Sequence, residues 1–418
     1  MNELGSSKQI INRASHDISR KNISSNALKV LYRLKDAEYE AYLVGGGVRD
    51  LLLERTPKDF DVATNATPNQ VRKLFRNSRI IGRRFRLVHV YFPDEIIEVS
   101  TFRANAEEPH VADTPNIEDE KPVVIKEDNT YGTIEEDAWR RDFTINALYY
   151  NISDFSVVDF TGGIQDLELK QIRMIGDPQQ RFHEDPVRLL RAIRLSSKLG
   201  FSIEPETAAL VKQLGHLLQH VPEARLLDEV IKLFFEGYAE ITFKALEKLN
   251  YLIVLFPSMH AQLQDVENNK ARQLIQLALK STDDRYHAMQ PLNPGFLLAC
   301  FLWPVMQNIL QLRQKRGDRF FIAFHAAMQE TIVAQAQVCL ITKRMSAMMR
   351  SMWTLQYHLE KKRPRRIYRL IQHRYFRAAF DLLCLRADCG EVPKELKNWW
   401  HSFQAAKPKQ RRAMVEKL

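Results

Sequence analysis

The pattern of apolar and polar positions divides the chain into an alternating first part and a helical second part. Between residues 41 and 101, short apolar runs with period-two alternation predict strands, among them 87–92 and 96–101. From residue 200 to about residue 350, apolar positions recur at helical spacing with almost no strand alternation. The pattern therefore predicts an α+β protein with a small mixed-sheet head followed by an elongated all-helical neck and body.

The head is organised around residues 41–62. This stretch predicts, in order, a strand at 41–44, a glycine turn at 45–47, a helical turn at 48–53 and a second strand that carries Asp59 and Asp61. Side chains two positions apart on a strand share a face, so the two aspartates are expected to point together. Paired carboxylates beside a glycine turn, whose backbone amides can approach a triphosphate, suit a magnesium site.

Each part alone is common in structural roles, since an Asp-X-Asp often ends a strand and three glycines often form a turn. Together, Leu-Val-Gly-Gly-Gly-Val-Arg-Asp at 43–50 and Asp-Phe-Asp-Val at 59–62 resemble the first signature of one nucleotidyltransferase branch. That branch contains bacterial poly(A) polymerases and CCA-adding tRNA nucleotidyltransferases. The resemblance implies a metal-binding aspartate pair and a triphosphate held by Gly45, Gly46 and Arg49.

A second signature lies at residues 133–149. Its polar cluster predicts a helix start capped near Asp142 or Thr144. The segment Arg-Arg-Asp-Phe-Thr-Ile-Asn-Ala is similar to the family motif that contacts ribose and phosphates. The similarity implies that Asp142 joins the catalytic carboxylates and that the nucleotide contacts come from Arg140, Arg141 and Asn146.

The third catalytic carboxylate has a second candidate, Glu98. This residue lies inside the strand predicted at 96–101, between apolar neighbours, and faces either solvent or the site. Two-metal phosphoryl transfer commonly uses a carboxylate beyond an aspartate pair. Both Asp142 and Glu98 therefore stay open.

A third signature lies at residues 181–194, where Asp185 precedes a proline and a helix is predicted to start. A helix cap and a surface ion pair between Asp185 and Arg188 are the structural alternative. In the family, Glu-Asp-X-X-Arg reads the Watson–Crick edge of the incoming base, and a guanidinium held by a carboxylate suits that task. The resemblance implies adenine selection by Asp185 and Arg188, with Arg191 facing the same pocket or solvent.

The composition favours a polyanionic partner, because the 418 residues carry a formal net charge of +10 and a sequence pI near 9.3. Two segments concentrate this charge and are predicted to bind RNA. The first is an arginine-rich strand entrance, and the second is a basic stretch interleaved with aromatic residues whose structural alternative is a helix with core aromatics. Their candidate RNA-binding residues are Arg83, Arg84, Arg86, Lys361, Lys362, Arg363, Arg365 and Arg366.

The remaining features predict a cytoplasmic monomer without an integral membrane segment. The first 20 residues are polar, and the apolar run at 295–306 contains Pro304 and falls short of the roughly 20 residues that span a bilayer. The four cysteines form no CxxC pair, which favours reduced thiols.

We expect five parts: a flexible extension at 1–24, a catalytic head at 25–165, a helical neck with base-recognition and RNA-binding elements at 166–250, a body at 251–360 and a basic RNA-binding region at 361–418. The resemblance implies template-independent polyadenylation of RNA 3′ ends from ATP with two Mg²⁺ ions, release of pyrophosphate, and RNA-degradation machinery as a possible partner. The segment at 82–90 resembles the poly(A) polymerase version of its motif. A CCA-adding enzyme is the alternative, and a catalytically silent RNA-binding homologue is disfavoured because the aspartate pair and the glycine turn are both retained.

Overall fold

The structure is a computed structural model, and it describes residues 8–82, 86–104, 130–264 and 269–418. Its internal contacts define two compact units. The first comprises Met1–Arg188 and Leu199–Gln213, and the second comprises Leu189–Lys198 and Leu214–Leu418. Helix α7 (Val187–Leu199) therefore carries the boundary between them. The five-part division of the sequence stays a prediction.

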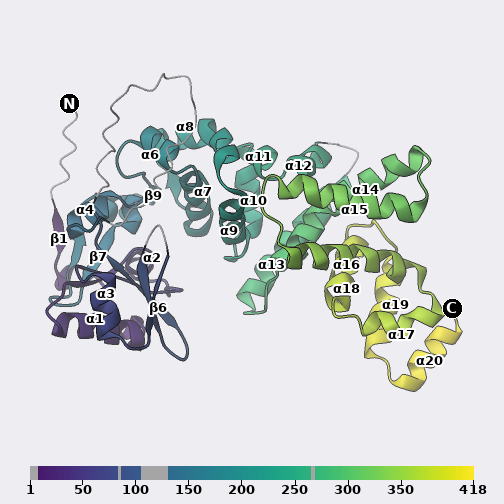
Figure 1. The fold of residues 1–418 in the computed structure, drawn as a ribbon, viewed down its shortest axis with the longest axis horizontal. Coiled ribbons are helices and arrows are strands. Elements are labelled where there is room, and N and C mark those ends of the chain that lie inside the picture. The colour runs from purple at the N-terminus through teal and green to yellow at the C-terminus, as the bar shows by residue number, and fades with distance from the viewer. Residues whose placement is uncertain (1–7, 83–85, 105–129, 265–268) are drawn as a thin grey trace. The chain divides into compact units, whose positions relative to one another are not determined.

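The first unit is built on a mixed sheet, as the alternating pattern predicts (Figure 1). Among the described residues, eight strands pair in the order β1-β8-β7-β2-β3-β6-β5-β4. Their bounds are β1 Gln9–Ile11, β2 Ala41–Val44, β3 Asp61–Thr64, β4 Ser78–Ile81, β5 Leu87–Tyr91, β6 Ile96–Thr101, β7 Leu148–Asn151 and β8 Val157–Asp159. Strands β3 and β6 are parallel, and the other neighbouring pairs are antiparallel.

Short helices and 3-10 turns complete this unit. They are η1 Arg13–Ser15, η2 Arg20–Asn22, α1 Ser25–Asp36, α2 Gly46–Leu52, α3 Pro68–Leu74, α4 Ile134–Trp139, η3 Thr144–Asn146, α5 Gly163–Glu168, α6 Pro178–Glu184 and α8 Pro205–Gln213, with a small parallel pair β9 Gln171–Ile172 and β10 Ser202–Ile203. Helix α1 packs against β2 and β3 through Ala27, Leu31 and Leu34, which are fully buried. The predicted cap of α3 is present, because Thr67 and Gln70 form a reciprocal capping box.

Three local expectations for the first unit are corrected. Residues 8–24 are not a flexible extension, since β1 pairs with β8 and the side chains of Ile18 and Ile23 are buried. Strand β3 begins at Asp61, so Asp59 lies just before the strand rather than within it. No helix starts at Asp142 among the described residues: a single 3-10 turn follows and leads directly into β7, because the apolar residues after it are needed as a central strand.

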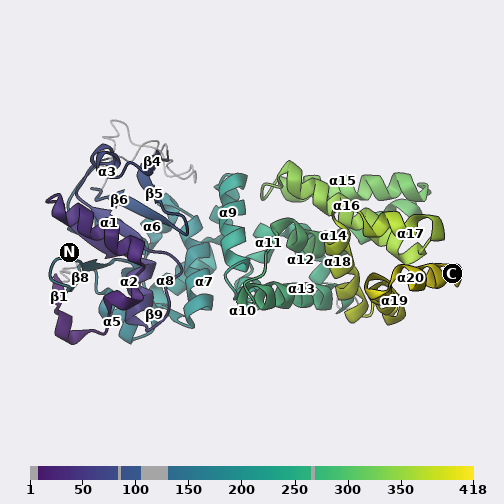
Figure 2. The same ribbon diagram turned by 90° about the horizontal axis from the view of Figure 1, so that it is seen from below.

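The second unit is helical, as the sequence pattern predicts, and the predicted α+β class is confirmed. Figure 2 shows α13, α14, α15 and α16 running through it. The elements are η4 Leu214–His220, α9 Glu223–Phe234, α10 Ala239–Lys248, α11 Leu252–Leu255, α12 Pro257–Leu263, α13 Asn269–His287, α14 Pro294–Lys315, α15 Phe320–Ala336, α16 Lys343–Lys361, α17 Pro364–Ile371, α18 Phe376–Asp388, α19 Lys394–Ala405 and α20 Pro408–Glu416.

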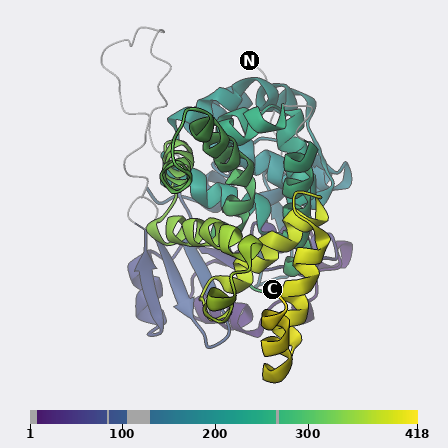
Figure 3. The ribbon, with the colours of Figure 1, turned by 90° about the vertical axis from the view of Figure 1, so that its right-hand side faces the viewer.

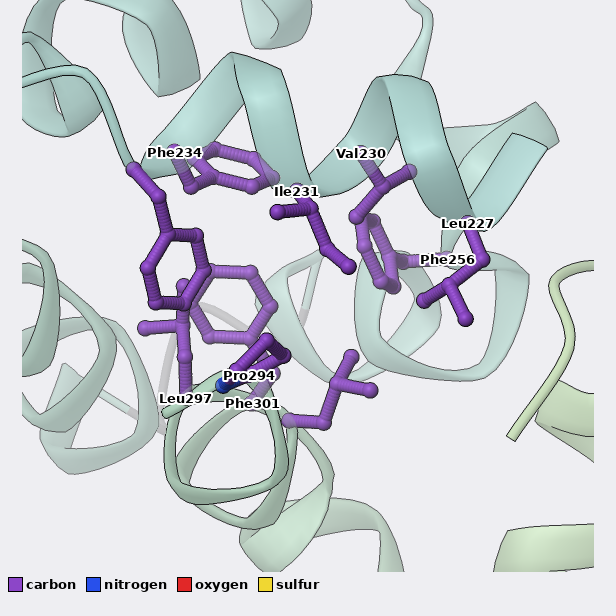
Figure 4. A pocket seen from close by; sticks show the side chains of 10 residues that line it. Leu227, Val230, Ile231, Phe234, Phe256, Pro294, Leu297 and Phe301 are labelled. Carbon is purple, nitrogen blue, oxygen red and sulfur yellow. The ribbon is translucent and has the colours of Figure 1, made fainter. Parts of the chain in front are cut away.

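Helix α14 supplies much of the core of the second unit. Its ring of Phe301 meets the rings of Phe234 and Phe256 edge-on, each with centroids 5.5 Å apart (Figure 4). Among the described residues, α14 is also the helix that is long and apolar enough to cross a bilayer, and 67% of its apolar window is buried within the protein. Its apolar character is therefore explained by packing against α13, α15 and α16.

The C-terminal helices enclose a smaller aromatic cluster. Trp400, Phe403, Phe376 and Ile367 form its buried centre. Figure 3 shows α19 and α20 at the yellow end of the chain. The clustering of these rings confirms the structural alternative for Phe376, whose side chain is core, while Tyr368 stays 43% exposed.

Candidate active site and RNA-binding residues

The glycine turn of the first signature forms the start of helix α2. Gly45 adopts φ +74° and ψ −137°, a left-handed conformation that side-chain-bearing residues rarely adopt. At Gly47, a β-carbon would lie 3.3 Å from the backbone oxygen of Asp59. The glycines therefore have two roles. Gly45 allows the tight turn from β2 into α2, and Gly47 allows the start of α2 to lie close to the aspartate pair.

The carboxylates of the first signature gather at the start of β3. The parallel pairing of β3 with β6 sets Asp61 opposite Glu98. Burial, and after it the charges of Asp59 and Glu98, raise the pKa of Asp61 to about 7, while the charge of Arg141 acts in the opposite direction. Three acidic groups thus share one electrostatic neighbourhood, which is the arrangement that a divalent cation would stabilise.

The fit to magnesium rests on the aspartate pair. Among the described residues, no group of three His, Cys, Asp or Glu side chains converges tightly enough to hold a metal by itself. Magnesium usually binds one or two carboxylates and completes its shell with water and substrate phosphates. Asp59 and Asp61 meet that requirement, and His89 fixes Glu98 beside them through a 3.1 Å contact between Nε2 and Oε1.

Asp142 has different neighbours. It is buried, and its Oδ1 accepts hydrogen bonds from the backbone N–H of Phe143 at 2.8 Å and from Nδ2 of Asn146 at 3.4 Å. Its charge also acts on Arg181, whose pKa is lowered mainly by burial. The structure therefore sets Asp142 among groups of the second and third signatures, whereas Glu98 lies beside Asp61.

Arg49 is held behind the glycine turn. It is only 3% exposed; its Nε and Nη2 donate to Oδ1 of Asp50, and its Nη1 donates to Oδ1 of Asn146 at 2.7 Å. A β-carbon at Gly46 would lie 3.4 Å from Nη2. The Arg49 guanidinium therefore packs against the glycine turn and places a fixed positive charge at the start of α2.

Arg141 stands on another side of the same turn. Its Nε and Nη2 donate to Oδ2 of Asp137, and Nε also donates to the hydroxyl of Tyr149 at 2.9 Å. A β-carbon at Gly45 would lie 3.6 Å from its Nη1. Since its charge also acts on Asp61, Arg141 lies near both the glycine turn and the carboxylates.

The third signature contains a guanidinium that the sequence analysis missed. Arg181 donates from Nη2 to the backbone oxygens of Arg140 at 2.7 Å and Arg141 at 2.6 Å, and from Nη1 to Glu184 at 3.0 Å. Arg188 in turn donates to the same Glu184 carboxylate at 3.0 Å and to the backbone oxygen of Arg181 at 2.7 Å. The spacing of three residues between Arg181 and Glu184 on one helix was the available signal.

Arg188 is therefore clamped by Glu184 and the end of α6. Asp185 is the C-cap residue of α6, and its backbone oxygen accepts from the N–H of Arg188 at 3.1 Å. Arg191 lies one turn further along α7, in the part of that helix assigned to the second unit. The contacts join the third signature to the second signature through Arg181.

The candidate RNA-binding residues differ from these fixed groups by being exposed. Arg83 and Arg84 lie outside the described residues, and Arg86 is exposed. The basic residues around α17 that are exposed are Lys361, Arg363, Arg365 and Arg366. Lys362 is partly buried, with its Nζ 5.2 Å from the ring centroid of Trp399.

Comparison with known proteins identifies the chain. Three family profiles match: "Poly A polymerase head domain" at residues 41–173, "Probable RNA and SrmB-binding site of polymerase A" at 200–263 and "Polymerase A arginine-rich C-terminus" at 316–418. Poly(A) polymerase I of Escherichia coli O6:H1 is 46% identical over 413 residues, covering 98% of this chain and 88% of that protein. The chain belongs to the poly(A) polymerase I family. The resemblance inferred from the three signatures is confirmed, and the activity of the family is that of a polynucleotide adenylyltransferase.

The CCA-adding alternative has less support. The CCA-adding enzyme of Bacillus subtilis is 40% identical over 207 residues, which is 50% of this chain and 49% of that enzyme. A crystal structure of the Bacillus stearothermophilus CCA-adding enzyme in complex with CTP superposes with a TM-score of 0.58 at 23% identity, covering 90% of this chain and 82% of that one. The structural similarity to the CCA-adding enzyme shows a shared fold. High sequence identity over nearly the whole chain is found with poly(A) polymerase I.

Proposed function

We propose that this protein extends RNA 3′ ends with adenylate from ATP, without a template and with release of pyrophosphate, and so marks RNA for decay. The observation that carries the proposal is the retained Asp59–Asp61 pair beside the glycine turn, in a chain 46% identical to a poly(A) polymerase I over 98% of its length. An RNA-binding profile within residues 200–263 supports RNA as the acceptor.

The metal-holding residues are Asp59 and Asp61, with Glu98 as the third carboxylate. We favour Glu98 over Asp142 because the pairing of β3 with β6 and the raised pKa of Asp61 both set Glu98 in the neighbourhood of the pair. When bound there, two Mg²⁺ ions would lower the pKa of the RNA 3′-hydroxyl and neutralise charge on the triphosphate. The protein's part is to hold these carboxylates together against their mutual repulsion.

The nucleotide is oriented by two sets of residues. The turn at Gly45 and Gly46 lets triphosphate oxygens approach the start of α2, where the N–H of Gly45 itself donates to the backbone oxygen of Leu148 at 3.4 Å, and Arg141 supplies a neighbouring positive charge. Arg49 contributes through its fixed charge behind the turn, since its donors are already used by Asp50 and Asn146. Charge that develops on the leaving pyrophosphate would therefore meet donors that are already in position.

Adenine selection is assigned to Asp185 and Arg188. Arg188 is held by Glu184 at 3.0 Å, so its planar donor fork is fixed before a base arrives. Arg181 links this fork to the backbone of the second signature, and Asn146 and Arg140 remain the candidates for ribose and phosphate contacts.

The remaining parts of the proposal concern the acceptor and the cell. The exposed basic residues near α17, with Arg86, are proposed to contact the RNA backbone. A solved structure of similar fold, with a TM-score of 0.56, is a tRNA nucleotidyltransferase complexed with a primer tRNA and an incoming ATP analog, and it supports an RNA 3′ end as the acceptor. We further propose a cytoplasmic monomer that meets RNA-degradation machinery.

The decisive experiment compares two acceptors. The purified protein with Mg²⁺ receives an unstructured RNA or a tRNA that lacks its CCA end, with each nucleoside triphosphate alone and in mixture. We expect a long ladder from ATP alone on the unstructured RNA, and no ladder from the Asp59→Asn variant. Addition that stops after CCA on the tRNA would instead establish the CCA-adding activity. RNA binding without incorporation would overturn the enzymatic proposal.

A further inference from the structure

The first unit contains a cavity of about 460 Å³ that the proposed activity does not use. Its volume falls within the roughly 300–1,000 Å³ typical of small-molecule sites. Its lining combines cationic side chains with aromatic rings. The cations are Arg13, Arg20 and Lys21, and the aromatic rings are Tyr32, Tyr150 and Phe155.

The cavity lies on the opposite face of the sheet from the candidate active site. Tyr149 and Tyr150 are neighbours on β7, and successive side chains of a strand point to opposite faces. The hydroxyl of Tyr149 donates to Asp137 at 2.7 Å on the face of Arg141. Tyr150 instead lines the cavity, together with Tyr32 from α1. The two sites therefore use different faces of one strand.

The cations are arranged around the aromatic rings. The guanidinium of Arg20 stacks 4.6 Å from the ring centroid of Phe155, and its Nη1 donates to the hydroxyl of Tyr32 at 2.8 Å. The charges of Arg13 and Arg20 both act on the hydroxyl of Tyr150, where they oppose the rise in pKa that burial causes. The exposed cations Arg13 and Arg20 therefore lie close enough to Tyr150 for their charges to reach this ring of the cavity.

The backbone at Phe155 is strained. Its φ of +63° is uncommon for a bulky residue. It is held there by a hydrogen bond from its N–H to the backbone oxygen of Asn151 at 2.9 Å and by His16, whose Nε2 lies 2.9 Å from the backbone oxygen of Phe155. Strained backbone that the surroundings hold in place is concentrated at binding sites. The N-terminal segment and the β7–β8 turn thus fix the Phe155 ring beside Arg20.

We propose that this cavity binds a nucleoside phosphate unit, with the base against the aromatic rings and the phosphate against Arg13, Arg20 and Lys21. Aromatic faces accept any base by stacking, and guanidinium groups match phosphate oxygens. The unit is either a free nucleotide or an unpaired nucleotide of a bound RNA. Occupancy is independent of turnover, so this site and the polyadenylation proposal can fail separately.

Photo-crosslinking of the full chain separates the two sources. One arm uses 8-azido-ATP, and the other uses a short oligoadenylate with an internal 8-azidoadenosine; labelled peptides are then mapped. We expect label on the peptide that carries Tyr32 in at least one arm, and the arm in which it occurs identifies the source. Label on the peptide with Asp59 and Asp61 serves as the internal positive control.

A paired variant tests the role of the cations. Arg13→Ala with Lys21→Ala changes exposed side chains and is expected to weaken labelling of the Tyr32 peptide about tenfold. The matched control is Arg33→Ala, an exposed α1 cation that stacks near the Phe75 ring, and it should leave labelling unchanged. Unchanged melting temperatures verify folding. Label confined to other peptides, or labelling that the paired variant does not reduce, would overturn the proposal.

Discussion

Positive charge is held in two different ways at the candidate active site and around helix α17. In the first unit, Arg49, Arg141 and Arg181 are buried or half-buried, and each donates to at least two fixed oxygens. In the second unit, cations such as Arg365 and Arg366 project into solvent around an apolar cluster. Fixed charges orient a reacting group, whereas exposed charges attract a polyanion over a distance without defining its position. The difference predicts that substitutions of the fixed arginines at the candidate active site change turnover and selectivity, and that substitutions of the exposed cations around α17 change RNA affinity.

The largest expected effect is at the aspartate pair. Asp59→Asn should lower kcat by at least about 10³-fold. The substitution removes a proposed ligand of the Mg²⁺ ions, and these ions stabilise the transition state of the chemical step. RNA affinity should stay within about twofold. Single-turnover incorporation of labelled ATP measures the first quantity and RNA binding the second. Asp36→Asn, an exposed aspartate at the end of α1, is the matched control.

The third carboxylate gives the next effect. Glu98→Gln should lower kcat about 10²-fold and raise the Mg²⁺ concentration needed for half-maximal rate, because Glu98 lies beside Asp61. Asp142→Asn should lower kcat less than tenfold, since its Oδ1 is occupied by Phe143 and Asn146. The rate of each variant, measured as a function of Mg²⁺ concentration, shows which of the two carboxylates is the metal ligand. If the losses were reversed, Asp142 would be the metal ligand.

Substitution of Arg188, which Glu184 holds, should change the selectivity between ATP and CTP. Arg188→Ala should reduce the ratio of kcat/KM for ATP to that for CTP by roughly 10- to 100-fold, because the donor fork is removed. Arg188→Lys should lose most of the ratio as well, since an ammonium cannot reproduce the planar fork held by Glu184. Steady-state kinetics with each nucleotide provide the measurement. An unchanged ratio would show that the fork does not read the base.

The sequence predicted the parts of this site that lie close together along the chain. The glycine turn, the aspartate pair and the Arg188 motif are local patterns with their own turn and cap chemistry. The register of β3 with β6, which sets Asp61 beside Glu98, depends on strands almost 40 residues apart and on the core that aligns them. Local spacing alone therefore could not decide between Asp142 and Glu98 as the third carboxylate.

Burial of a charged group was likewise invisible in the sequence. Arg181 and Arg386 are both drawn inward, yet only the first contacts a functional motif. Arg386 is 3% exposed, pairs with Glu360 at 2.7 Å and Glu391 at 2.9 Å, and stacks 4.4 Å from the ring centroid of Trp303. Its partners belong to helix packing of the second unit. The identity of the neighbours, and not burial itself, separates a site arginine from a structural one.

A smaller effect concerns stability. Because burial and the charges of Asp59 and Glu98 raise the pKa of Asp61 from 3.8 to about 7, the folded protein holds this proton more tightly than the unfolded chain. Ionisation of Asp61 therefore opposes folding. This cost is absent below the unfolded pKa, accumulates as the pH rises toward 7, and is complete above it.

Asp61→Asn should consequently be more stable than the natural protein by about 1–2 kcal/mol at pH 8, allowing for the partial exposure of the group. The gain should shrink as the pH falls toward 5. Urea denaturation at both pH values tests this, with Asp36→Asn as the control. Mg²⁺ should raise the melting temperature of the natural protein more than that of the variant. A gain that did not depend on pH would contradict the electrostatic explanation.

The smallest effect is expected where charge is exposed. Arg365→Gln combined with Arg366→Gln should raise KM for RNA about three- to tenfold near physiological salt and leave kcat and the ATP/CTP ratio unchanged. The slope of log affinity against log salt should fall by about one for each lost phosphate contact. The melting temperature should not move, because both side chains project away from the cluster of Trp400 and Phe403. The matched control is Lys315→Gln, another exposed cation of the second unit that lies outside the C-terminal helices. A fall in kcat would mean that charges in this region also position the RNA, and the contrast between the fixed arginines of the candidate active site and the exposed cations around α17 would then no longer hold.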